Sequence, residues 1–152
     1  MRDTCKICGD TIEQCNERAN RRIDLKELAE RCEQAAGPDR ELDEAIVLTA
    51  LGWKRADYKR GGRTIRAWDN GEYRQERAPD FYTASLDAAM TLVPDGISVR
   101  LFVHPDESHC DIYQSHQAKE MGEAEQAATP ALALCAAALR AIAAHQAKDQ
   151  GR

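Results

Sequence analysis

The chain has 152 residues, a length typical of one domain that can bury a hydrophobic core without covalent or metal staples. Hydrophobic residues make up 43% and charged residues 31%, which excludes the intrinsically disordered, collagen-like and coiled-coil classes. The 21 basic and 26 acidic residues give a net charge of -5, which argues against a protein that coats nucleic acid.

Nothing in the sequence predicts export or insertion into a membrane. The first ten residues lack the apolar stretch of a signal peptide. The most apolar run, residues 131–139, has about half of the ~20 residues needed to cross a bilayer. We therefore expect a cytoplasmic protein with no membrane partner. In that reducing compartment, six cysteines favour buried thiols or metal ligands over disulfides.

Helical periodicity predicts two helices in the first third of the chain. Residues 23–36 place Leu25, Leu28 and Cys32 at helical spacing, and Gly37 with Pro38 ends this helix. Asp39 is the predicted cap of a second helix, whose acidic first turn suits the positive end of the helix dipole. The buried stripe of that helix is predicted to contain Leu42, Ala45, Ile46 and Thr49.

Two hairpins and two further helices are predicted in the rest of the chain. Residues 65–68 alternate in polarity, and a turn at Asn70 and Gly71 predicts a return strand over 72–75. A short helix follows, capped by Thr83 or Ser85. Residues 97–103 and 110–114 form the second hairpin, and 117–128 are predicted as a loop or irregular helical turn. The last helix has Thr129 as its cap and Pro130 in its first turn.

The predicted fold class is α+β, with element order ααββαββα. Two antiparallel hairpins can join into one four-stranded sheet, and helices on both faces would give an α-β-α sandwich. We expect three parts: a small cysteine knuckle over 1–22, the sandwich over 23–147, and a disordered tail over 148–152.

Four motifs together resemble a known family: LAERCEQAAGPDRELDEAI, LGW, FYTASLDAAMTLVP and ATPALALCAAALRA. They are similar to the phage ABA-sandwich domain of phage and prophage proteins. The resemblance covers roughly residues 25–144 and is most specific in the last motif and in YTASLDAA. It implies a helix-sheet-helix sandwich and a phage or prophage origin, hence the cytoplasm of a bacterial host. The family has no agreed activity, so the resemblance implies no catalytic residues.

The sharpest local motif is the pair Cys5 and Cys8, which Gly9 follows. Two cysteines at this spacing turn both sulfurs toward one point, and zinc takes four such ligands in a tetrahedron. Cys15 and either Cys32 or a histidine could complete the set. The sequence therefore predicts a structural zinc site at these four cysteines. Unliganded thiols in an N-terminal tail and a redox dithiol are the alternatives.

Three histidines and a cysteine cluster within thirteen residues: His104, His109, Cys110 and His116. His104 and His109 flank a short loop, so this pair could bind metal, with Cys110, or complete the cysteine site. The alternative is a solvated loop with titratable histidines. A nucleophilic pair of Cys110 and His104 is a further hypothesis. However, Cys110 alternates in phase with Ile112, which predicts that the thiol faces the core.

Residues 53–68 hold six basic residues against one acid, with three aromatic residues among them. Cations of this kind could contact phosphates, while Trp53, Tyr58 or Trp68 stack on bases. The same composition also fits a solvated surface loop with two core tryptophans. The candidate nucleic-acid contacts are Lys54, Arg55, Lys59, Arg60, Arg63 and Arg66.

From these patterns we expect a non-enzymatic phage accessory module with a structural zinc ion. Its partner would be a host or phage protein or a small ligand. A nucleic-acid or nucleotide binder is the first alternative, and a small metal- or cysteine-dependent enzyme is the second. The sequence has no phosphate-binding P-loop, no G-x-G-x-x-G and no G-x-S-x-G elbow.

Overall fold

The computed structural model describes residues 9–21, 23–114, 119–120 and 125–151. Within them the chain is α+β, with five helices and three small antiparallel sheets. The helices are α1 Ile12–Ala19, α2 Leu25–Gln34, α3 Arg40–Ala50, α4 Leu86–Met90 and α5 Pro130–Gln150. The strands are β1 Lys54–Arg55, β2 Tyr58–Arg60, β3 Arg63–Ile65, β4 Trp68–Asp69, β5 Arg74–Gln75, β6 Ile97–Val103, β7 Ser108–Gln114, β8 Lys119–Glu120 and β9 Glu125–Ala127.

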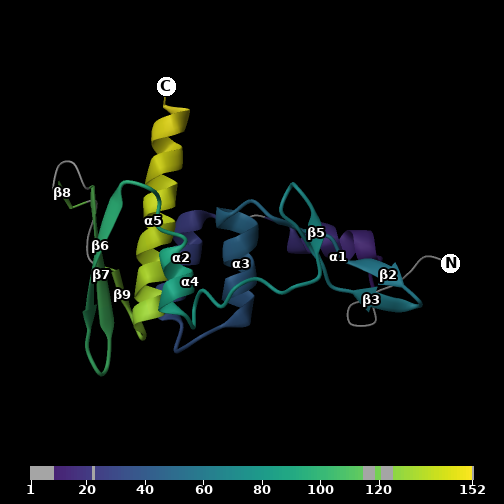
Figure 1. Ribbon diagram of the computed structural model, residues 1–152, viewed down its shortest axis with the longest axis horizontal. Coiled ribbons are helices and arrows are strands. Elements are labelled where there is room, and N and C mark those ends of the chain that lie inside the picture. Colours follow the sequence, from purple (N-terminus) through teal and green to yellow (C-terminus); the bar gives the residue numbers. More distant parts are fainter. Residues whose placement is uncertain (1–8, 22, 115–118, 121–124, 152) are drawn as a thin grey trace.

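The molecule is elongated, with three regions in a row (Figure 1). The sheet of β6, β7, β8 and β9 stands at one end, and α2, α3, α4 and α5 fill the middle. At the other end lies a smaller unit that combines α1 with β1 to β5. We call this the small unit; it consists of residues 9–21 and 53–78. Two stretches far apart in sequence therefore build one end of the molecule.

Side-chain caps begin several of the helices, as their sequences predict. The Asp39 carboxylate accepts the backbone N–H of Glu41 at 2.8 Å, and the Thr129 hydroxyl accepts the N–H of Leu132 at 3.3 Å. Both predicted caps are thus confirmed. Ser85, rather than Thr83, caps α4.

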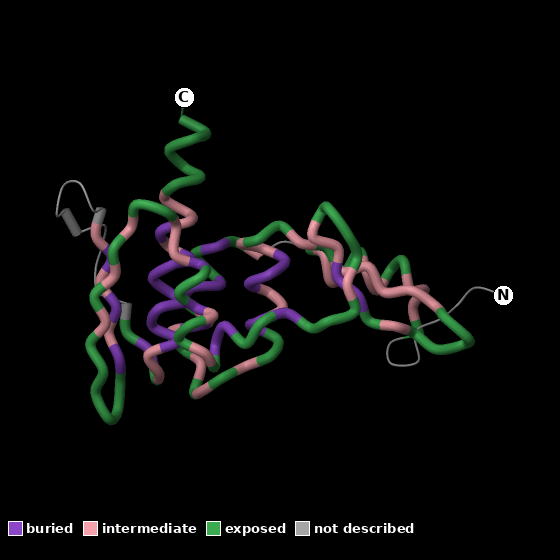
Figure 2. Tube along the Cα trace, viewed as in Figure 1, coloured by how far each residue is buried: buried purple, intermediate pink, exposed green. Residues whose placement is uncertain are grey.

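The core is built around the first half of α5. All nine residues from 131 to 139 are buried, so this segment is enclosed on every side (Figure 2). Its many alanines let neighbouring elements approach closely, with the sheet on one side and α2 and α4 on the other. The last turns of the helix are exposed and project from the body, and the helix continues to Gln150, past the boundary predicted at 147.

By length and hydropathy alone, α5 is a candidate membrane span within the part of the chain that the structure describes. More than half of its apolar window is buried against other elements of the protein. A core helix of this composition meets the same two criteria, so they are weak grounds for a membrane location.

The largest sheet is centred on β7, which pairs with β6 along its whole length and with β8 and β9 on its other edge. The inner face packs against α5 through Val99, Leu101, Cys110 and Ile112. No described helix covers the outer face in Figure 1. The helices that are described lie on one side of this sheet, so the predicted α-β-α sandwich is not confirmed.

The two predicted hairpins do not join into one sheet. Strands β4 and β5 pair with β1 in the small unit, whereas β6 and β7 belong to the sheet on α5. The early strands are two or three residues long and rich in charge, so they lack the apolar face needed to pack on the helices. The large sheet instead gains β8 and β9 from residues 117–128, which were predicted as a loop or helical turn.

Candidate nucleic-acid interface

Helix α1 is attached to the edge of the small unit by two asparagine side chains. The Asn20 amide accepts the N–H of Arg55 at 2.5 Å and donates to its carbonyl at 3.1 Å. Asn16 makes the same pair of bonds to Asp57, at 3.1 and 3.2 Å. Residues four apart on a helix are ~6 Å apart along its axis, close to the ~6.7 Å between alternate strand residues. The two amides therefore take the place of a neighbouring strand.

Arg55 connects the small unit to α3. Its side chain is 11% exposed, with Nε 2.7 Å from Oδ1 of Asp57 and Nη1 3.2 Å from Oε2 of Glu44. Its guanidinium carbon lies 5.7 Å from the ring centroid of Trp68. Arg66 reaches the other oxygen of Glu44 at 3.5 Å. Arg55 is thus neutralised and largely buried at the junction, where it is poorly placed to contact phosphates, whereas Arg66 stays 57% exposed beside it.

A tight hairpin places two arginines side by side at the tip of β2 and β3. Gly61 and Gly62 both have positive φ, 57° and 75°, which the two-residue turn requires and other residues rarely adopt. Arg60 is paired directly with Arg63 across this turn. Cross-strand pairs share a face, and alternate residues do too, so Tyr58 lies on the same face as both arginines.

This face continues onto the three-stranded sheet through Arg74. The guanidinium of Arg74 lies 4.4 Å from the ring centroid of Tyr58, and that of Arg60 lies 5.5 Å from it. Lys54, Asp69 and Arg74 are aligned across β1, β4 and β5, so they share one face of that sheet. We call the continuous surface the cationic face; it consists of Lys54, Tyr58, Arg60, Arg63 and Arg74, with Asp69 between Lys54 and Arg74.

Glu76 is the acid that organises the centre of the cationic face. Its carboxylate accepts hydrogen bonds from the Tyr58 hydroxyl and from Arg60. The bond to Tyr58 lowers the pKa of Glu76, and the same bond raises the pKa of Tyr58. Both side chains are thus held in place while Arg63 and Arg74 remain exposed.

The structure brings together only part of the predicted nucleic-acid set. Lys54, Arg60 and Arg63 lie on the cationic face, Arg55 and Arg66 lie at the junction, and Lys59 lies on the opposite face of its hairpin. Arg74 and Glu76 were missed because they follow the basic segment. Arg74 could have been found, because the predicted return strand over 72–75 places this residue beside the basic segment.

The predicted stacking role of the tryptophans is not supported by their placement. Trp68 is 3% exposed, and Trp53 packs against the main core, as the alternative interpretation of two core tryptophans expected. The ring of Tyr58 is approached by two guanidinium groups. Tyr73, which was not singled out, is 58% exposed and lies at the turn before β5.

The predicted zinc ligands fall in different parts of the chain. Cys5 and Cys8 lie outside the described residues. Cys15 is half-buried on α1 in the small unit, whereas Cys32 is fully buried in the main core on α2, so these two are not brought together. Burial raises the pKa of the Cys32 thiol to about 12. Within the described ranges, no group of three metal-ligating side chains is assembled.

The histidine loop is folded as a tight turn at the tip of β6 and β7. The rings of His104 and His109 meet edge to face, with centroids 5.7 Å apart. Cys110 is fully buried and packs in the core against α5, as its alternation with Ile112 predicts. His109 and Cys110 are neighbours on a strand and so point to opposite faces, which separates this thiol from the histidine pair. His116 lies outside the described residues.

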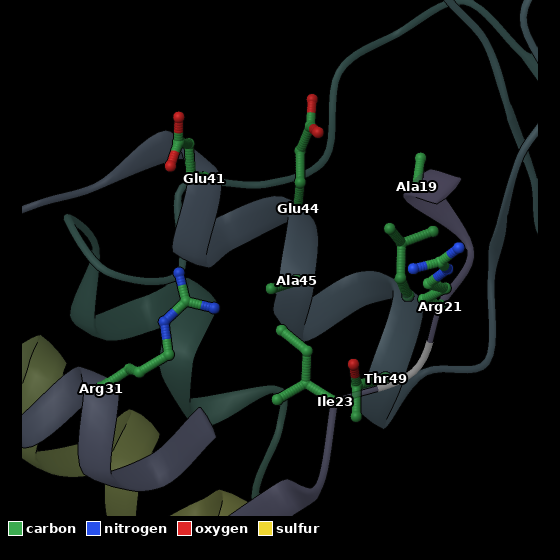
Figure 3. Close-up of a pocket in the computed structure, with 9 residues that line it drawn as sticks. Ala19, Arg21, Ile23, Arg31, Glu41, Glu44, Ala45 and Thr49 are labelled. Carbon is green, nitrogen blue, oxygen red and sulfur yellow. The ribbon is translucent and has the colours of Figure 1, made fainter. Parts of the chain in front are cut away.

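A cavity of about 220 Å³ marks the junction between the small unit and the helices (Figure 3). Ile23, Ala45 and Leu48 form its apolar part, and Arg31 and Glu41 stand at one end. Glu44 also lines this cavity, but its carboxylate is bound to Arg55 and Arg66. The cavity is therefore a packing gap beside a salt-bridged junction.

A scan against family models, a search of curated proteins and a search of solved structures found no match to this chain. The likeness to the phage ABA-sandwich domain thus stays a prediction from the quoted motifs.

Proposed function

We propose that the protein is a non-enzymatic binding module whose small unit contacts nucleic-acid phosphates through the cationic face. The observation that carries this proposal is the convergence of Lys54, Arg60, Arg63 and Arg74 from four strands onto one surface. Guanidinium groups bind phosphate oxygens with paired donors, and positively charged surfaces of this kind supply sequence-independent affinity.

The distribution of charge supports the same proposal. Residues 53–78 hold eight basic and four acidic residues, in a chain with five more acids than bases. The positive charge is therefore concentrated at one end of an elongated, otherwise acidic molecule. Such an arrangement orients the protein on a polyanion and keeps the acidic body away from it.

The contacts of Tyr58 favour recognition of the backbone over recognition of bases. Its ring is covered by Arg74 and approached by Arg60, so it holds cations in position instead of offering a free surface for stacking. We therefore propose binding with little dependence on base sequence.

We further propose that the zinc site involves Cys5, Cys8 and Cys15, as an N-terminal staple. The support is the poor core of the small unit, in which Ala67 and Trp68 are the buried residues among those described. Units with so little apolar burial commonly depend on a metal or a disulfide. Elemental analysis should find zinc that Cys5→Ser removes, whereas zinc-free protein with a folded small unit would contradict the proposal. A phage origin fits such an accessory module and stays part of the proposal.

The nucleic-acid proposal is tested by fluorescence anisotropy with a labelled 20-nucleotide single strand and a duplex of the same length. Affinity should fall steeply with salt, since each phosphate contact adds about 0.7 to 0.9 to the slope of log affinity against log salt. Arg63→Ala and Lys54→Ala should each weaken binding to every sequence and lower that slope by about 1.

Lys148→Ala is the matched control, because it removes one exposed cation from the far end of α5. It should leave both affinity and slope unchanged. No binding at low salt, or equal losses from Lys148→Ala and Arg63→Ala, would contradict the proposal.

A further inference from the structure

Strand β6 forms an open edge of the large sheet. It pairs with β7 over all seven of its residues, and no described strand pairs with its other edge. The turn between the two strands is closed by a hydrogen bond of 3.0 Å from the His104 N–H to the Glu107 carbonyl. Hydrogen-bonded pairs alternate along an antiparallel ladder, so the even-numbered residues of β6 bond to β7. The backbone groups that point to the open edge therefore include those of Val99, Leu101 and Val103.

This open edge lacks the features that natural sheets use to prevent pairing. Edge strands are commonly protected by a proline, a bulge or a charge on the inward face. β6 contains no proline, and its register with β7 is unbroken. Its one charged residue, Arg100, lies on the outer face, where the guanidinium carbon is 4.9 Å from the ring centroid of Tyr113. A regular and mostly apolar edge of this length can accept a further strand.

The apolar side chains of β6 are only partly covered by the protein itself. Helix α5 packs mainly on β7 and β9, so β6 lies at the margin of the core. Val99 and Leu101 are half-buried there, and Val103 is 63% exposed on the same face. Phe102 is 42% exposed on the opposite face. A strand added at the open edge would cover apolar surface on both faces.

We propose that two copies of this chain pair through their β6 edges, antiparallel, with Leu101 opposite Leu101 of the second copy. In this register Val99 lies opposite Val103 of the second copy, so the inner face becomes a continuous apolar row. Arg100 lies opposite Phe102 of the second copy, and a guanidinium group can rest against an aromatic ring. A register centred on Arg100 would instead oppose two like charges, which is destabilising.

Backbone and symmetry agree with this pairing. The residues whose backbone groups point to the open edge meet one another, which gives about six hydrogen bonds between the copies. A twofold axis through the Leu101 pair makes the contact the same in both copies, as closed dimers require. The small unit lies at the opposite end of the molecule (Figure 1), so the pairing leaves both cationic faces free and does not depend on nucleic-acid binding.

The pairing is tested by sedimentation equilibrium of the full chain at concentrations up to about 0.5 mM, because contacts of this size associate weakly. A concentration-dependent dimer is expected. Amide hydrogen exchange, followed by NMR in the same series, locates the contact. The Leu101 and Val103 amides should exchange rapidly in dilute protein and slowly in concentrated protein. The Arg100 and Phe102 amides bond to β7 and should be protected throughout.

Val103→Lys places a charge against Val99 of the second copy and should raise the dissociation constant of the dimer roughly tenfold or more, since the symmetric dimer carries the change twice. Met90→Lys is the matched control, because it makes the same kind of change at a residue of α4 that is 45% exposed. It should leave the dissociation constant unchanged.

Three outcomes would overturn the proposal: a monomer at every concentration, equal exchange of the Leu101 amide in dilute and concentrated protein, or equal losses from the two lysine variants. The first two are measured on the unaltered chain and so do not depend on any variant folding.

Discussion

Asp43 is the buried carboxylate on which the joint between α3 and the segment before α4 depends. It is 1% exposed and accepts hydrogen bonds from the N–H and the hydroxyl of Thr83, at 2.8 and 2.9 Å. Arg40 adds an ion pair at 2.9 Å, and its own side chain is 42% exposed. Replacing this carboxylate should therefore cost stability through the buried bonds more than through the ion pair.

We expect Asp43→Ala to lower the free energy of unfolding by about 3 to 5 kcal/mol, because two bonds to a charged acceptor are lost and the Thr83 N–H is left buried and unpaired, while the Thr83 hydroxyl keeps only the Asp39 carbonyl at 3.1 Å. Asp43→Asn keeps an acceptor for Thr83 and loses mainly the ion pair. The pair with Arg40 is half open to solvent on the arginine side and should contribute about 1 kcal/mol, and weaker acceptance by the neutral amide adds a similar loss. The asparagine variant should thus lose only about 1 to 2 kcal/mol.

The assay is urea unfolding of the full chain followed by circular dichroism. A double-mutant cycle of Asp43→Ala with Thr83→Val should show that the two losses are not additive, since they remove the same bond. Equal losses from the alanine and asparagine variants, or additive losses in the cycle, would refute the assignment of stability to the Thr83 bonds.

Three further predictions test other parts of the fold. Asn20→Asp places an oxygen against the Arg55 carbonyl, so hydrogen exchange should speed up in α1 while the main core keeps its protection. The pKa of Cys32 is raised to about 12 by burial, so stability should fall by up to about 1.4 kcal/mol per pH unit as pH rises from 9 to 12. Cys32→Ala should lessen that fall without abolishing it, because burial also raises the pKa of Cys135, and an unchanged slope would contradict the prediction. Thr129→Ala removes the cap of α5 and should cost about 1 kcal/mol in thermal unfolding; no loss would contradict the capping role.

The elements that could be predicted are those whose signals are local. Asp39 and Thr129 cap the helices that their sequences predict, and alternation over 97–103 gives β6 with its observed bounds. The turn at Asn70 and Gly71 likewise joins β4 to β5. Alternation does not specify which sheet a strand enters, and so the two hairpins were wrongly joined.

The roles that were missed depend on contacts between distant residues. α1 itself has local signals that were overlooked, a capping box of Thr11 with Gln14 and an apolar stripe of Ile12, Cys15 and Ala19, but none of its residues is fully buried. Its stability comes from Asn16 and Asn20, which meet residues 41 and 35 positions away. From the sequence alone, Arg55 is expected to be a surface cation. Its partner Glu44 lies on α3, which precedes the basic segment. The junction role of this arginine could be found only from the fold.

Because α1 is attached by polar contacts, the small unit should have a lower free energy of local unfolding than the helical core. The helices around α5 share an apolar interior, whereas the small unit is joined to them and within itself mostly by amide and guanidinium bonds. Mild urea should loosen the small unit first and leave the rest closed. A polyanion that binds only the folded small unit would then raise the urea concentration at which that unit unfolds. The urea midpoint of the helical core would stay the same.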